Sequence, residues 1–405
     1  MRVLILHCEL GTLRGGGENF TRNLFTSFVA RGHSVRAAFA AGPLGRYPFP
    51  LPAGIEPMPI RGWDARGFGQ AALSAVGRRL NGRQALVRKW DYIQNGLEWR
   101  TSYWYNWMFQ KRILRRLAEA TRDVDVVYVH SNPFLAREVA RVRPTVLRLP
   151  GPLSAEMLPV LRSIHAVCAN GDALHRLRSF LGEHAIELPV GLDDRHFSPG
   201  GDSSRRLLGW TAAHKIVGYV GRLSRIKGVD ILAEGFRHLA KIRSDARLLI
   251  VGSGEEEGNL RAMLKAEIGR GLVYLAGDVR HDQLPQWYRA MDLLVMPSRY
   301  ENFSNAILEG LACEIPFVGS DVGGNRRLHE TGAGWLFDLN SPTSLAAVLD
   351  HALSDGNAVK TRGRLGRTQV QGRYSWRASA QQLEEIVRTL APGMNCCAEK
   401  LPNDL

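Results

Sequence analysis

The chain alternates short apolar runs with longer stretches in which apolar residues recur every three or four positions. Residues 3–6 form the first run, and an uninterrupted apolar run is typical of a strand buried on both faces. A glycine-rich loop follows, and then Phe20, Leu24 and Phe28, whose spacing predicts the apolar face of a helix. A further strand beginning at His33 completes a predicted βαβ unit.

The same alternation continues in two blocks. Further strands are predicted at residues 124–129, 145–149, 216–220, 248–251, 272–275 and 293–296, and helices at residues 232–242 and 375–390. Alternating strands and helices predict an α/β protein with two doubly wound parallel-sheet, Rossmann-like domains. Residues 188–201, which are rich in proline and glycine, are the expected linker.

The composition of the 405-residue chain is that of an ordinary globular protein, with 45% hydrophobic and 23% charged residues. The formal net charge is +14, and most of the excess lies in residues 1–198. A basic surface suits an anionic partner such as a phosphate, a nucleic acid or an acidic membrane, but it also serves solubility alone. The charge therefore does not decide among these partners.

The cysteines and the apolar runs indicate the cellular compartment in which the protein is expected. The five cysteines are an odd number with no CxxC spacing, which indicates neither a disulfide framework nor a zinc site. We therefore expect a reducing, cytoplasmic setting. The first apolar run is too short for a signal peptide. No run approaches the ~20 residues of a membrane span, so no spanning helix is expected.

Residues 88–116 break the α/β pattern, because tryptophan and tyrosine crowd together there with arginine and lysine. Two interpretations stay open. The segment is either a buried helix of the N-terminal domain or an interfacial helix, with its rings at headgroup depth and its basic side chains on anionic lipid. The second interpretation predicts peripheral contact with an anionic membrane.

Two loops are candidates for binding phosphate. Arg222 and Lys227 share a loop between a predicted strand and a predicted helix, which is where doubly wound sheets bind ligands. Their fixed charge suits a diphosphate, although a solvated basic turn explains them equally well. Gly15, Gly16 and Gly17 follow the first strand and would let the backbone approach a phosphate. This turn is neither GxGxxG nor a P-loop, so it does not identify a ligand by itself.

Glu301 and Glu309 follow the strand at residues 293–296, and a helix is expected to begin near Ser304. On a continuous helix the two carboxylates would be ~12 Å apart, whereas a glycosidase acid/base pair needs about 5–9.5 Å. They therefore fit two hydroxyl-bearing parts of one extended ligand better than one shared proton transfer. The free N–H groups of Ser304 and Asn305 would suit a phosphate. Two surface glutamates on an amphipathic helix are the alternative.

His130 ends the predicted strand at residues 124–129, where it would bond a sugar hydroxyl or a leaving phosphate. A capping or core histidine is the alternative. Asp123 and Asp125 resemble a metal-chelating DxD motif, but they precede a strand and are interpreted as turn and cap residues. No group of His, Cys, Asp and Glu has metal-ligand spacing, so no metal site is predicted.

In their order and spacing these motifs resemble the group 1 (family 4) retaining glycosyltransferases of the GT-B fold. The resemblance covers nearly the whole chain, from the glycine loop and RGHSV at residues 31–35, through DVVYVH, GR…KG and E-x7-E, to YSW at residues 374–376. The family implies two domains that face an interdomain cleft. Its implied boundaries are an acceptor-side domain at residues 1–190, a nucleotide-sugar-binding domain at 191–372, a helix at 373–392 that crosses back to the first domain, and a tail at 393–405.

The resemblance also implies a role for each matching residue. Arg222 and Lys227 would hold the donor diphosphate and stabilise the departing nucleotide. Glu309 would bind the ribose and Glu301 the transferred sugar. His130 would lie near the sugar and the acceptor, and with Arg222, Lys227 and Glu301 it forms the implied catalytic set. Further donor contacts are implied for Gly16, Gly17, Val279, Phe303, Ser304 and Asn305.

The reaction implied by the family is transfer of a hexose-type sugar, with retention of configuration, from a UDP- or GDP-type donor. The acceptor would be a hydroxyl of a saccharide or of a lipid-linked saccharide, as in polysaccharide biosynthesis in the cytoplasm or at the inner membrane face. The family implies no metal and no cofactor. The leaving phosphate, rather than a side chain, would deprotonate the acceptor, and no nucleic-acid partner is expected.

The sequence departs from the family pattern at two residues, and two other functions stand as alternatives to the transferase. Val190 stands where the family usually has asparagine in its linker, and Arg327 stands where it usually has glutamate. One rival is a nucleotide-sugar 2-epimerase on the same fold, which the E-x7-E series disfavours. The other is a nucleic-acid-binding scaffold, favoured only by the pI of about 9.9 and expected to bind with steep salt dependence.

Overall fold

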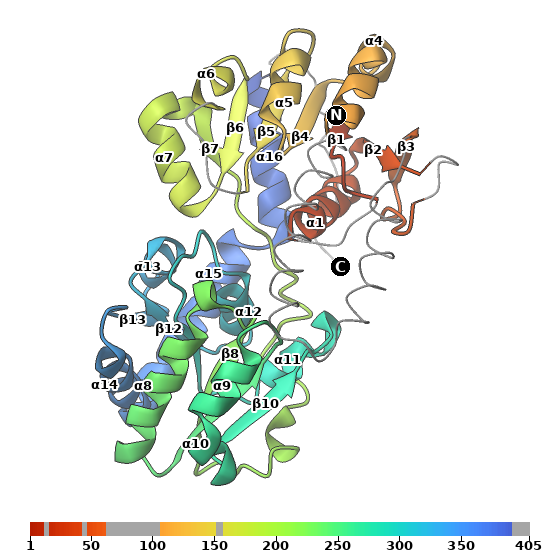
Figure 1. The fold of residues 1–405 in the computed structure, drawn as a ribbon. Helices are drawn as coiled ribbons and strands as arrows, with labels where there is room; N and C mark the ends of the chain where they lie inside the picture. The colour runs from red at the N-terminus through yellow and green to blue at the C-terminus, as the bar shows by residue number, and fades with distance from the viewer. Residues whose placement is uncertain (12–15, 43–46, 62–105, 151–156, 391–405) are drawn as a thin grey trace, which may run out of the picture. The chain divides into compact units, whose positions relative to one another are not determined.

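The computed structural model describes residues 1–11, 16–42, 47–61, 106–150 and 157–390. The chain divides into two compact units, and each has its own parallel sheet (Figure 1). The first unit comprises Met1–Ala169, Leu177–Leu188 and Ala380–Leu405, and the second comprises Asn170–Arg176 and Pro189–Ser379.

The sheet of the first unit has seven strands in the order β3-β2-β1-β4-β5-β6-β7. Its strands are β1 (Arg2–Leu6), β2 (Ser34–Ala41), β3 (Ile55–Arg61), β4 (Val126–His130), β5 (Thr145–Arg148), β6 (Ala166–Ala169) and β7 (Ala185–Glu187). Its helices include α1 (Gly16–Ala30), α4 (Leu117–Ala120), α5 (Pro133–Ala140), α6 (Leu158–Leu161), the C-terminal part of α7 (Gly171–Leu181) and most of α16 (Trp376–Leu390). All neighbouring strands are parallel. The strand order reverses between β1 and β4, which makes this the doubly wound topology with its switch point there.

The sheet of the second unit has six parallel strands in the order β10-β9-β8-β11-β12-β13, with its switch point between β8 and β11. The strands are β8 (Lys215–Val220), β9 (Ala246–Val251), β10 (Val273–Gly277), β11 (Leu293–Met296), β12 (Phe317–Ser320) and β13 (Gly334–Phe337). The helices are α8 (Val229–Ile242), α9 (Glu257–Met263), α10 (Lys265–Gly269), α11 (Leu284–Tyr288), α12 (Asn305–Ala312), α13 (Gly323–His329), α14 (Pro342–Ser354) and α15 (Gly356–Arg373).

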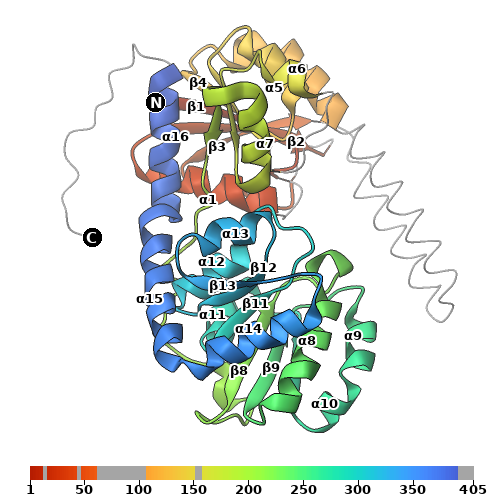
Figure 2. The ribbon, with the colours of Figure 1, turned by 90° about the vertical axis from the view of Figure 1, so that its left-hand side faces the viewer.

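Alternation along the strands builds two cores in the second unit, one on each face of its sheet. Leu293 and Val295 of β11 belong to the core that α8 and α14 complete, and these two helices lie side by side (Figure 2). Leu294 and Met296 of the same strand point to the opposite core, with α11, α12 and α15. A strand that must be apolar on both faces reads as an uninterrupted apolar run, and this run is what the sequence displays.

The predicted α/β class with two doubly wound parallel sheets is confirmed. The structure adds five strands that the sequence pattern did not predict: β3, β6, β7, β12 and β13. Four of the five have three or four residues, and small or polar residues such as Gly319 and Ser320 in β12 dilute the apolar signal. Within the described ranges, no helix combines the length and the apolar character that crossing a membrane requires.

Candidate functional site

The loops that leave β8 and β11 meet at the switch point of the second unit. Gly228 has a φ of +68°, and a Cβ atom on it would lie 1.9 Å from the carbonyl oxygen of Pro297. Beside this contact, Arg299 of the β11 loop forms an ion pair at 2.7 Å with Asp230 in the first turn of α8. Because only glycine permits this close approach, the two loops are fixed against each other at the carboxyl ends of the strands.

Lys227 and Glu301 meet at this point. The Nζ atom of Lys227 lies 2.7 Å from Oε2 of Glu301, and the hydroxyl of Ser298 donates to the same oxygen at 3.2 Å. Glu301 is buried, whereas about a third of the Lys227 side chain is exposed. The main-chain carbonyl of Glu301 accepts a hydrogen bond from Gly324 at the start of α13. An ordered cation and carboxylate therefore lie side by side, with the cation reachable from solvent.

Glu309 lies on α12 and has its own set of partners. The hydroxyl of the fully buried Tyr288 donates to its Oε2 atom at 2.7 Å, and Nε2 of His281 lies 3.1 Å from its Oε1 atom. The hydrogen bond to Glu309 raises the pKa of His281 above its ordinary value. Sequence reasoning missed His281 and Tyr288 as partners, although both follow the expected base-binding position, Val279, by only a few residues.

The helix α12 begins at Asn305, so Glu301 precedes it and a helical rise does not set the separation of Glu301 and Glu309. The helix begins near Ser304 as predicted, and Ser304 is its N-cap, with a hydroxyl that accepts a hydrogen bond from the N–H group of Ile307 at 3.3 Å. The two glutamates have separate sets of hydrogen-bond partners. Their assignment as two anchors of one ligand stays a prediction.

Arg222 lies on the same loop as Lys227, and its backbone is held more firmly than its side chain. The hydroxyl of Tyr219 donates to the carbonyl of Arg222 at 2.8 Å. The side chain of Arg222 is 74% exposed, with its Nε atom 3.3 Å from Glu255. Its guanidinium is therefore free to rearrange onto an anionic ligand at little cost, since an exposed pair contributes about 0–1 kcal/mol.

Three other expected donor-binding residues line the same region with less definite roles. Val279 and Phe303 are half-buried against the core shared with α12, and the ring of Phe303 lies 5.4 Å from that of Tyr374. Asn305 is exposed at the start of α12. Arg327, the departure from the family pattern, lies in the last turn of α13, where positive charge complements the helix dipole.

His130 occupies the corresponding switch point of the first unit, at the carboxyl end of β4. Its ring stacks on that of His7, at the end of β1, with ring centres 4.1 Å apart. Gly16 and Gly17 open α1, and a Cβ atom on Gly17 would lie 2.7 Å from Nε2 of His130. The glycine is therefore required at residue 17 so that the helix can approach the histidine.

Polar partners fix the two rings in place. The hydroxyl of Thr21 lies 3.1 Å from Nδ1 of His7 and 3.4 Å from Nδ1 of His130, and Glu18 lies 3.3 Å from Nε2 of His7. Burial, together with the proximity of His7 and Arg148, lowers the pKa of His130 well below its ordinary value. His130 is therefore a neutral imidazole at neutral pH. Sequence reasoning missed His7, whose signal is that it ends its strand as His130 does.

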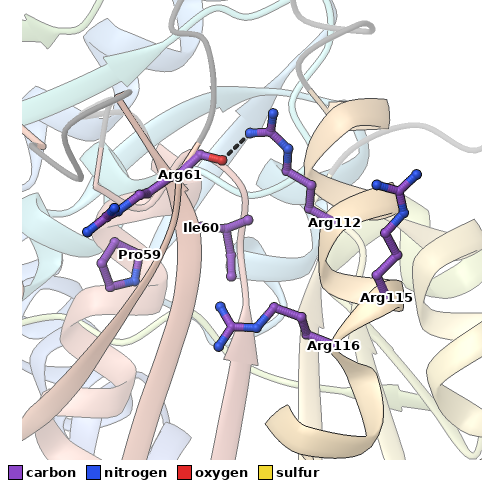
Figure 3. Close-up of a pocket in the computed structure, with 6 residues that line it drawn as sticks. All are labelled: Pro59, Ile60, Arg61, Arg112, Arg115 and Arg116. Atoms are coloured by element: carbon purple, nitrogen blue, oxygen red, sulfur yellow. Dashed lines mark hydrogen bonds between the residues drawn. The ribbon is translucent and has the colours of Figure 1, made fainter.

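Only part of the aromatic and basic segment 88–116 is described, because residues 88–105 lie outside the described residues. Residues 106–115 are helical, with Phe109 and Ile113 buried and Trp107 42% exposed under the ammonium group of Lys111. This helix and the end of β3 line a pocket of about 580 Å³ (Figure 3). The pocket is lined by Pro59, Ile60, Arg61, Arg112, Arg115 and Arg116. The described part is therefore buried on one face and basic on another.

The carboxylate of Asp125 binds Arg2 at the start of the neighbouring strand β1, so these contacts do not test the interpretation of Asp125 as a turn and cap residue. Its carboxylate accepts from the N–H group of Arg2 at 2.7 Å and from the guanidinium of Arg2 at 2.8 Å. Among the residues that the structure describes, no three or more His, Cys, Asp or Glu side chains are grouped so that they could hold a metal ion.

Comparison with known proteins adds to this geometry. Residues 214–355 match the family of group 1 glycosyl transferases. A GDP-mannose-dependent monoacylated alpha-(1-6)-phosphatidylinositol monomannoside mannosyltransferase of Corynebacterium glutamicum is 28% identical over 229 residues, which are 53% of this chain and 60% of that protein. The chain spans about half the length of the curated relatives it matches.

Solved structures share the fold over almost the whole chain. Sucrose-phosphate synthase from Thermosynechococcus elongatus matches with a TM-score of 0.69 and 17% identity, over 97% of this chain and 100% of that one. HepE from Anabaena, solved in complex with UDP, matches with a TM-score of 0.65 and 20% identity, over 96% of this chain and 100% of that one. Residues 214–355 therefore resemble the group 1 glycosyl transferases, and the chain has the GT-B fold that these solved structures share.

Proposed function

We propose that this chain transfers a hexose-type sugar from a UDP- or GDP-type nucleotide sugar to an acceptor hydroxyl, with retention of configuration and without a metal ion. The observation that carries the proposal is the pair Lys227–Glu301 beside the separately anchored Glu309, at the switch point of the second sheet. The donor specificity of the mannosyltransferase relative and the UDP complex of HepE support a nucleotide-sugar donor.

The proposed reaction uses the charges on the β8 loop. The bond between the anomeric carbon and the diphosphate breaks, and a new bond forms to the acceptor oxygen, whose proton passes to the leaving phosphate. Lys227 and Arg222 stabilise the negative charge that develops on the diphosphate, which is the kind of electrostatic stabilisation that contributes most to many enzymes. Glu301 accepts hydrogen bonds from hydroxyls of the transferred sugar, and Glu309 accepts them from the ribose.

Thermal unfolding in the presence of UDP, GDP, ADP or TDP tests the donor site. A nucleotide that binds the folded protein raises the melting temperature by mass action. We expect UDP or GDP to give the largest shift and the shift to persist in EDTA. The absence of a shift with every nucleotide would contradict the donor site, and a shift that EDTA abolishes would contradict metal independence.

Glu309→Gln tests the ribose contact. The amide keeps an oxygen that accepts from Tyr288, so the fold is preserved, but the charged acceptor for the ribose hydroxyls is lost. Hydrogen bonds to charged groups contribute about 1.5–3 kcal/mol, so nucleotide binding should weaken roughly tenfold to a hundredfold. The matched control is Glu234→Gln on the exposed side of α8, which should bind as the wild type does. Equal affinity in the two variants would remove Glu309 from the site.

For the acceptor, we propose a saccharide or a lipid-linked saccharide, with residues 88–116 in peripheral contact with anionic lipid. The four arginines of the pocket in Figure 3 and the exposed Trp107 support such a contact, since basic and aromatic side chains favour an anionic headgroup region. Flotation with vesicles of phosphatidylcholine and phosphatidylglycerol should carry the protein with the lipid. Recovery of all protein in the soluble fraction would exclude this contact.

A further inference from the structure

Arg148 is a buried cation at the carboxyl end of β5. Its strand partner on β4 is His130, and only 4% of the residue is exposed. Its guanidinium carbon lies 4.4 Å from the centre of the Phe20 ring of α1. Since Gly17 of α1 also contacts His130, helix α1 covers both side chains on the same face of the sheet.

The ionisable side chains that interact with Arg148 are uncharged at neutral pH. Burial raises the pKa of Tyr128 above its ordinary value and raises the pKa of the Cys168 thiol to about 12. His130 is neutral because its pKa is lowered. Glu18, the carboxylate of this cluster, contacts His7 instead. Among the described residues, the Nε and Nη1 atoms of Arg148 have no hydrogen-bond partner.

An arrangement of this kind is unfavourable in the unliganded protein. Burying an ion without a charged or hydrogen-bonding partner costs more free energy than a cation–π contact recovers. Arginine does not escape the cost by releasing its proton, because it stays charged in proteins. A ligand that carries negative charge would compensate the unpaired positive charge of Arg148. Buried ionisable groups in unusual environments are frequent at functional sites.

We propose that Arg148 binds an anionic group of the acceptor, a phosphate or a carboxylate, at the carboxyl edge of the first sheet. The inference rests on the proposed function and narrows its acceptor to molecules with such a group. The planar guanidinium presents paired N–H donors that match the two oxygens of either group. The anion binds next to His130, whereas the diphosphate of the donor is matched by Arg222 and Lys227 in the second unit.

Inorganic phosphate is the probe, and chloride at equal ionic strength is its reference. Melting temperatures are measured with and without saturating nucleoside diphosphate, so that the donor site is also tested when it is filled. Phosphate should raise the melting temperature of the wild type. Arg148→Met should weaken phosphate binding about tenfold to a hundredfold, because hydrogen bonds to charged groups are lost, and should leave the nucleotide-induced shift unchanged.

The same variant separates a binding role from a structural one. In chloride, Arg148→Met should melt at or above the wild-type temperature, because a methionine removes a buried unpaired charge. A clearly lower melting temperature would assign Arg148 to the architecture and overturn the proposal. Arg162→Met, at an exposed arginine that ends α6 in the first unit, is the matched control and should keep the phosphate shift.

Four further outcomes are decisive. A phosphate shift that survives in Arg148→Met, or a wild type that does not respond to phosphate, overturns the proposal. Loss of the nucleotide-induced shift in Arg148→Met would assign the anion to the donor and also overturn it. A wild type that responds to phosphate but to none of the nucleotides would contradict the proposed function while supporting the anion site itself.

Discussion

At the scale of single residues, the buried glutamates of the second unit have hydrogen-bond donors as partners, whereas the buried His130 of the first unit has no carboxylate partner among the described residues. Glu309 and Glu301 are buried carboxylates whose partners are donors: Tyr288 and His281 for one, Lys227 for the other. His130 is a buried imidazole without a carboxylate of its own, stacked on a second histidine and next to a cation. A buried imidazole without an opposite charge adopts its neutral form, so the stability of the folded protein depends on pH.

The lowered pKa of His130 sets the sign of this dependence of stability on pH. Its pKa is lowered in the folded protein, so between that value and about 6.5 the unfolded chain binds a proton that the folded chain does not. The stability contributed by His130 is therefore complete above about pH 6.5 and falls as the pH falls. His130→Gln, neutral at every pH, should flatten this slope by up to about 1.4 kcal/mol per pH unit. Urea unfolding across this pH range measures it, and equal slopes in wild type and variant would contradict a buried neutral imidazole.

At the scale of elements, the position of the donor site depends on loops that only glycine allows to meet. Gly228 joins the β8 loop to the end of β11, and Gly252 joins the β9 loop to the β8 loop, where a Cβ atom would lie 1.9 Å from the carbonyl oxygen of Gly221. The strands set where the loops begin, and the glycines set how closely the loops pack. Lys227 reaches Glu301 because of both.

Gly228→Ala should therefore destabilise the second unit and weaken nucleotide binding together. A left-handed backbone costs a non-glycine residue about 1–2 kcal/mol, and the contact with Pro297 adds to that cost. Gly209→Ala is the matched control, since Gly209 has a φ of +66° but nothing within 4 Å of its Cβ position. It should show the backbone cost alone and bind nucleotide normally. Equal unfolding free energies for the two variants would mean that the contact between the loops contributes nothing.

At the scale of the whole molecule, the C-terminal helix α16 contributes to the first unit although it follows the second in sequence. Glu384 of α16 is buried and pairs with Arg31 and His33, which lie between α1 and β2. Both Nε and Nη2 of Arg31 donate to the carboxylate of Glu384, and the bond from Nη2 to Oε2 is 2.8 Å long. The Nε2 atom of His33 lies 2.7 Å from Oε1 of the same carboxylate. The first unit is therefore completed by residues from both ends of the chain.

Glu384→Gln should lower the stability of the first unit and leave the second unchanged. Each unit has its own core, so we expect two calorimetric transitions. Loss of the paired charge should cost roughly 1–3 kcal/mol in the first-unit transition, since the partly exposed Arg31 is left without its counter-charge. Nucleotide should still raise the other transition. Glu385→Gln, at the exposed neighbouring residue, is the control, and an equal effect of the two substitutions would remove the ion pair as the cause.

The sequence by itself determined the α/β class, the two parallel sheets, the start of a helix near Ser304 and the order of the motifs, because these depend on local periodicity and on residues near one another in the chain. It did not determine the partners of the site residues. Lys227 meets Glu301, and Glu309 meets Tyr288, only because parallel strands bring the loops at their carboxyl ends to one edge of a sheet.

The tertiary structure alone also decided which charges are balanced. In the sequence Arg148 is one basic residue among many in a positively charged chain. Its importance depends on burial and on neighbours from other strands and from α1, all of them neutral. Electrostatic free energy depends on distances in space and on exclusion of water, and neither quantity is encoded in the spacing of residues along the chain.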